Sequence, residues 1–129
     1  MILLEIPGAL FGVYDAVYSL GRALAMAGSR LLELDERELG VELIPLQNTS
    51  LGIVVYDVTP GGAGHCRELL SAGNEWVALA REILYVNADH DLLCRKACLD
   101  CILDFSGQYA ASHLNRRAAL ALLDRIQVA

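Results

Sequence analysis

The sequence predicts an α/β fold of the α+β kind, in which a small sheet of about three strands is packed by a long N-terminal helix and by C-terminal helices. Short apolar runs that suit strands occupy residues 1–6, 41–46 and 51–58. Apolar residues at steps of three and four indicate helices over residues 10–34 and 114–128. Together these two patterns indicate a mixed fold.

The first strand and the first helix are separated by Pro7 and Gly8. The apolar run before them is too short for a helix and fits a buried strand, which the two residues are expected to end. The helix over residues 10–34 is amphipathic, because its charged side chains fall away from its apolar face. The apolar positions of this helix are Val13, Val17, Leu20, Leu24, Ala27 and Leu31.

Two β-like runs, over residues 41–46 and 51–58, are separated by the turn-type residues 47–50, and this arrangement predicts a β-hairpin. The second run, LGIVVYDV, is rich in β-branched residues and apolar on both faces. Such a composition favours a central strand that is covered on both sides.

The rest of the chain is expected to be largely helical. Helical pieces are predicted at residues 66–70 and 75–86, with a break near residues 71–74. The apolar face of the second piece consists of Trp76, Leu79, Ala80, Ile83 and Leu84. The last helix, over residues 114–128, has Asn115 as its expected N-cap.

The composition indicates a single domain, residues 1–129, whose core is large enough to need no disulfide. Hydrophobic residues make up 55% of the chain, above the roughly 45–50% of ordinary soluble domains. Part of this apolar surface is therefore expected to meet a partner, either another protein or a second copy in a homodimer. The formal charge of −6 argues against a free-standing nucleic-acid binder.

The apolar N-terminal segment lacks the features of a signal peptide or a membrane helix. It has no basic first segment, and Glu5, Asp15 and Arg22 interrupt it. No run therefore approaches the roughly 18–20 uncharged residues that a membrane span needs. We expect a cytoplasmic protein without membrane contact, in which thiols are free or metal-bound rather than paired in disulfides.

Cys94, Cys98 and Cys101 lie close together, and the Cys98-x2-Cys101 pair has the spacing with which a tight turn brings two thiolates to one tetrahedral ion. The neighbouring cations Arg95 and Lys96 favour thiolates. We therefore predict a cysteine knuckle that holds Zn2+ and organises the fold. Two alternatives remain open: small buried hydrophobic residues on one helix face, because steps of four and three align them equally well, or a redox role.

A structural zinc site usually has a fourth protein ligand. Cys66 is the first candidate, because a thiolate is the softer match and the preceding loop could bring it to the cluster. His65, His90 and His113 are alternatives, as is a position completed by solvent. The predicted metal ligands are thus Cys66, Cys94, Cys98 and Cys101.

The sequence PGGAG at residues 60–64 follows an apolar strand, at a place where α/β proteins bind phosphate on a helix N-terminus. Because it lacks the Lys-Ser/Thr pair of a Walker loop and the full GxGxxG spacing, a tight turn with positive φ is the favoured interpretation. Asp57, at the strand end, is expected to cap this loop. The alternative is a metal-dependent enzyme that acts on a phosphate ester through Asp57 and the loop.

Three ordered segments resemble the MrfA-type zinc-binding domain. They are YDVTPGGAGHC at residues 56–66, CRKACLDCILDFSGQ at residues 94–108 and HLNRRAALALLDR at residues 113–125. The family pattern is YD-x-x-PGGAG, then a cysteine cluster that continues as C-x-x-CL and Q, then LDR-x-x-AL-x-x-L. The resemblance covers most of the chain after about Leu20, and Asn115 replaces the usual Asp of the LDR motif.

The resemblance implies a domain of MrfA-type DNA-repair helicases or of DrmB-like phage-defence proteins, in which cysteines bind zinc. Cys94, Cys98 and Cys101 match the clustered ligands, whereas the family's fourth cysteine often lies nearer the cluster than Cys66 does. The chain contains no helicase motifs, and no catalytic residue is assigned. A non-catalytic accessory domain or small subunit is implied, with a helicase as partner and DNA reached through it. A structural dimerisation module is a further alternative.

Overall fold

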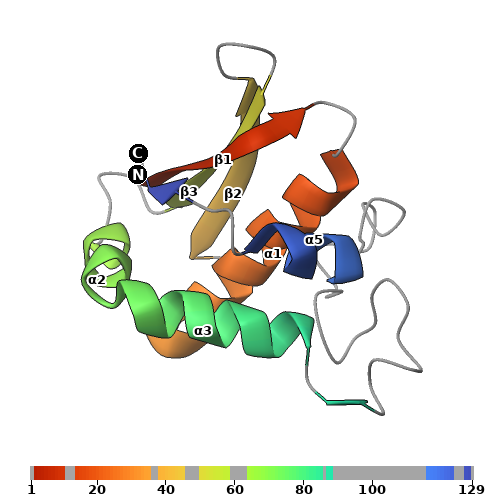
Figure 1. The fold of residues 1–129 in the computed structure, drawn as a ribbon. Helices are drawn as coiled ribbons and strands as arrows, with labels where there is room; N and C mark the ends of the chain where they lie inside the picture. Colours follow the sequence, from red (N-terminus) through yellow and green to blue (C-terminus); the bar gives the residue numbers. More distant parts are fainter. Residues whose placement is uncertain are drawn as a thin grey trace.

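The computed structural model describes residues 2–10, 14–35, 38–45, 50–58, 64–85, 87–88, 116–123 and 127–128. These residues form a mixed fold of strands and helices, as the sequence predicts (Figure 1). In chain order the elements are β1 (Ile2–Leu10), α1 (Tyr14–Leu31), β2 (Leu39–Pro45), β3 (Ser50–Asp57), α2 (His65–Ser71), α3 (Gly73–Leu84), α5 (Arg116–Leu123) and β4 (Gln127–Val128).

The sheet is antiparallel, with the strand order β2-β3-β1-β4. The predicted hairpin is confirmed, because β2 and β3 pair from Leu39 opposite Asp57 to Pro45 opposite Leu51. β3 is an internal strand, as its β-branched composition indicates. In addition to the strands expected from the sequence, the sheet contains the short strand β4, which pairs with β1.

The described helices lie on one side of the sheet (Figure 1). α1 packs against β2 and β3 on this side, and also against α3 and α5. Of its predicted apolar face, the members without solvent exposure are Val17, Leu20, Leu24 and Ala27. Leu31 is half-buried, and Val13 lies outside the described residues. Ile53 of β3 and Leu4 of β1 are neighbours in the same core, whereas Leu3 and Val54 pair on the opposite face, outside the core cluster. The described helices therefore cover one face of β3, while on the other face Val54 is still buried, at 8% exposure.

α1 lies close to β2 because Gly21 has no side chain. A Cβ atom added to Gly21 would lie 2.7 Å from Cγ1 of Val41 and 3.4 Å from Cγ2 of Ile53. The first distance is shorter than carbon atoms tolerate, and Val41 has little rotamer freedom with which to move away. Glycine at this position thus sets the separation of helix and sheet.

β1 continues through Pro7, which the sequence predicts to end it. Regular pairing with β3 runs from Ile2 to Glu5 and resumes only at Leu10, with a register irregularity between them. Proline cannot donate a ladder hydrogen bond, and such an irregularity is where a strand tolerates it. The strand is therefore longer than the predicted run over residues 1–6.

The last helix is shorter than the predicted 114–128. α5 ends at Leu123, and Gln127 and Val128 are extended because they pair with Glu5 and Leu4 of β1. Apolar periodicity does not detect such a pairing, since the partner strand is at the other end of the sequence. The expected N-cap, Asn115, lies outside the described residues.

α2 and α3 confirm the predicted broken helix. Ala72 is both the C-cap of α2 and the N-cap of α3. Of the predicted apolar face of α3, Trp76, Ala80, Ile83 and Leu84 are buried, and Leu79 is partly buried against the core. In the part of the chain that the structure describes, no helix has the length and apolar character to cross a membrane.

Candidate metal centre

The residues considered as metal ligands divide into two groups. Those outside the described residues are Cys94, Cys98, Cys101, His90 and His113, and their roles stay predictions. Cys66 and His65 belong to α2, whose structure is described. The structure therefore describes α2, which carries Cys66 and His65, and the two helices that flank the cysteine segment, residues 94–101.

The cysteine segment is connected to the core on both sides. α3 precedes it and ends at Leu84, and α5 follows it and begins at Arg116. Leu84 of α3 and Ala119 of α5 are both buried. The two helices pack against each other and against α1. The chain therefore leaves one helix layer before the cysteine segment and returns to the same layer after it, which local sequence patterns do not reveal.

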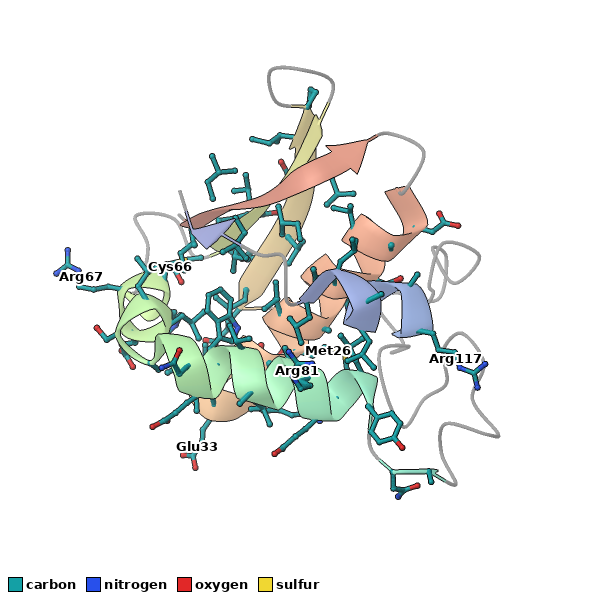
Figure 2. All side chains as sticks on the ribbon, viewed as in Figure 1. Met26, Glu33, Cys66, Arg67, Arg81 and Arg117 are labelled. Atoms are coloured by element: carbon teal, nitrogen blue, oxygen red, sulfur yellow. The ribbon has the colours of Figure 1, made fainter. Side chains whose placement is uncertain are left out.

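Cys66 is the second residue of α2 and lies on the side of this helix near the sheet (Figure 2). Its side chain is 5% exposed and belongs to the hydrophobic core. The Sγ atom donates a hydrogen bond to the main-chain carbonyl of Val55 in β3, at a distance of 3.5 Å. Sequence reasoning missed this partner, because Val55 and Cys66 meet only when the strand and helix are packed.

The turn into α2 confirms the expected positive φ. Gly64, the last glycine of PGGAG and the N-cap of α2, has φ 81° and ψ 6°. Glycine adopts this left-handed conformation without the steric cost of a Cβ atom. No described side chain makes a capping hydrogen bond at this N-cap. Asp57 is half-buried at the end of β3, and its predicted contact with residues 60–63 concerns a segment outside the described residues.

The described residues do not form a metal centre by themselves. Among them, no three His, Cys, Asp or Glu side chains are grouped so that they could hold an ion. Asp57, His65 and Cys66 are therefore close in sequence without forming a ligand set of their own. A metal centre in this chain would therefore include residues outside the described part.

The described residues form a small α/β body, and the cysteine segment comes between two helices that pack on each other. The chain is thus a small mixed domain with a candidate metal-binding segment. The family model of the MrfA Zn-binding domain matches residues 20–102, which is more than half of the chain and includes all four cysteines. The chain therefore belongs to the MrfA Zn-binding domain family, in agreement with the resemblance of its motifs.

Among curated proteins, the chain is similar to Druantia protein DruE of Escherichia coli (strain UMEA 4076-1). The two are 31% identical over 116 residues, which cover 84% of this chain and 6% of that protein. The chain thus spans about 6% of the length of the curated relative that it matches. No solved structure matches the chain.

Proposed function

We propose that this chain is a non-catalytic zinc-binding accessory domain, or a small subunit, of a DNA helicase complex that acts in defence or repair. The observation that carries the proposal is the family match over residues 20–102, because the matched stretch contains every cysteine of the chain. The family is described as Zn-binding, and a cluster of thiolates is the ligand type that structural zinc prefers.

Cys94, Cys98 and Cys101 are the proposed core of the ligand set. Zinc bound to them would fix the segment between α3 and α5, two helices that already pack on each other. The role of the ion is then structural: it orders a surface that the body of the domain presents to its partner. The sequence ranks Cys66 first for the fourth position.

The share of the relative that this chain matches supports an accessory role. The matching stretch is 6% of Druantia protein DruE, so in that protein it is a small part of a much longer chain. The resemblance to the MrfA-type domain supports a helicase as the larger protein with which this domain acts. A formal charge of −6 favours contact with DNA through that partner over direct binding by this chain.

Zinc content tests the proposal directly. The purified full chain should carry one zinc ion per chain in native mass spectrometry, and Cys98→Ala should lose it. A folded wild-type chain that binds no zinc would refute the proposal.

Hydrolysis assays test the non-catalytic part of the proposal. The zinc-loaded chain should not cleave a model phosphodiester or ATP, with or without DNA. Zinc-dependent hydrolysis that Asp57→Ala abolishes, while zinc content and circular dichroism stay unchanged, would favour the enzyme hypothesis instead.

A further inference from the structure

We propose that Cys66 is a core thiol and not a zinc ligand, so that this chain holds its zinc with three sulfur atoms and one nitrogen or oxygen atom. The inference rests on the proposed zinc-binding function and specifies its ligand set. It departs from the ligand order that the sequence suggests, and three features of Cys66 carry it.

The first feature is the hydrogen bond of the thiol. Sγ of Cys66 lies 3.5 Å from the carbonyl oxygen of Val55 and can only be the donor, because a carbonyl oxygen has no hydrogen to give. A cysteine that ligates zinc does so as a thiolate and has lost that hydrogen. The contact with Val55 and a bond to zinc therefore require different states of the same sulfur atom.

The second feature is the surroundings of the side chain. Cys66 is 5% exposed and belongs to one cluster with residues such as Ile53 and Trp76. A tetrahedral ion bound to this sulfur at about 2.3 Å would need three further ligands around it. Among the described residues no such group exists, and the described residues that share this cluster with Cys66 are apolar.

The third feature is the contribution of Cys66 to the packing of α2. The two buried residues of this helix are Cys66 and Leu69, which are three positions apart and lie on one face. Leu69 is next to Gly28 of α1, since a Cβ atom at Gly28 would lie 3.1 Å from one of its methyl groups. Cys66 contacts β3 and Leu69 contacts α1, so the thiol belongs to one of the two buried side chains that position this short helix.

The consequence follows from the number of cysteines. The chain has four, so without Cys66 the remaining sulfur ligands are Cys94, Cys98 and Cys101. A closed structural site would then take a histidine as its fourth ligand, and an open one would take solvent oxygen. The histidines of the chain are His65, His90 and His113.

X-ray absorption at the zinc edge tests the ligand set on the zinc-loaded, full-length wild-type chain. The expected first shell has three sulfur atoms near 2.3 Å and one lighter atom near 2.0–2.1 Å. A shell of four sulfur atoms in a monomeric chain would overturn the proposal. This measurement needs no variant, so it decides the question even if a substitution at Cys66 prevents folding.

Matched variants supply the second test. Cys66→Ala should bind as much zinc as the wild-type chain, whereas Cys98→Ala should lose stoichiometric zinc. The emission of Trp76, the one tryptophan of the chain, reports whether the core is intact in each variant. Loss of zinc from Cys66→Ala with wild-type Trp76 emission would overturn the proposal, whereas a wild-type chain without zinc would refute the proposed function itself.

Thiol alkylation after chelation supplies a third test that does not depend on zinc being bound. In the native, chelated protein, three thiols should react quickly with N-ethylmaleimide, and peptide mapping should find Cys66 protected. Equal reactivity of all four thiols while Trp76 emission stays native would contradict a core position for Cys66.

Discussion

The indole Nε1 of Trp76 donates a hydrogen bond to the main-chain carbonyl of Leu24 at a distance of 2.8 Å. The bond connects α3 to α1, which are far apart in the sequence and packed against each other in the fold. Trp76 is 2% exposed, so both its ring and its donor are removed from water. The contact satisfies the polar group of a large aromatic side chain in the core cluster.

Substitutions at Trp76 should separate its hydrogen bond from its packing. Trp76→Phe removes the donor and part of the ring, and should lower the free energy of unfolding by about 1–3 kcal/mol. Trp76→Ala also leaves a cavity, and should lower it by about 3–5 kcal/mol. Urea unfolding followed by circular dichroism measures both. The exposed neighbour Glu75→Ala is the control, and equal stability of Trp76→Phe and wild type would mean that the bond contributes nothing.

Gly21→Ala should destabilise the protein although alanine favours helices. The new Cβ atom meets Cγ1 of Val41 at 2.7 Å, and such overpacking costs about 1–3 kcal/mol, against a helix-propensity gain of about 1 kcal/mol. The double variant Gly21→Ala/Val41→Ala removes the clash, so the two substitutions should couple favourably in a double-mutant cycle. Additive effects in thermal or urea unfolding would contradict a direct contact.

Gly64→Ala tests the left-handed turn that begins α2. No atom of the described residues lies within 4 Å of a Cβ atom built on Gly64, so we attribute the expected cost to its φ of 81°. We expect a loss of about 1–2 kcal/mol in the free energy of unfolding. Gly73→Ala is the matched control, because it is equally free of neighbours and has no positive φ. Equal effects of the two substitutions would show that the conformation of Gly64 is not the cause.

Leu4→Ala and Leu3→Ala compare the two faces of β1. Leu4 is 1% exposed in the core, whereas Leu3 is half-buried on the face that the described helices leave uncovered. Leu4→Ala should cost about 2–5 kcal/mol in unfolding free energy, and Leu3→Ala less than half as much. Equal losses in urea unfolding of the isolated chain would mean that both faces of the strand are packed.

Removal of zinc should leave the body of the domain folded. Among the described residues, one core joins the sheet to α1, α2, α3 and α5. After chelation, Trp76 emission and a cooperative thermal transition should persist, while Cys94, Cys98 and Cys101 become reactive. Loss of the cooperative transition on chelation would show instead that the ion holds the whole fold together.

Much of this fold could be predicted from local patterns. The apolar face of α1, the hairpin of β2 and β3 and the break at Ala72 follow from periodicities and turn residues close together in the sequence. The pairing of Val128 with Leu4 could not be predicted, because it joins the two ends of the chain. The extension of β1 beyond Pro7 could not be predicted either, because it depends on pairing with a strand that is distant in the sequence.

The candidate site could also be predicted only in part from the sequence. The sequence by itself determined that three thiols, Cys94, Cys98 and Cys101, lie close together along the chain, and their spacing predicts the ligands of one soft metal ion. Only the tertiary structure decided the surroundings of Cys66. Its burial and its bond to Val55 arise when α2 packs on β3, because a thiol is equally suited to a core and to a metal until its neighbours are known.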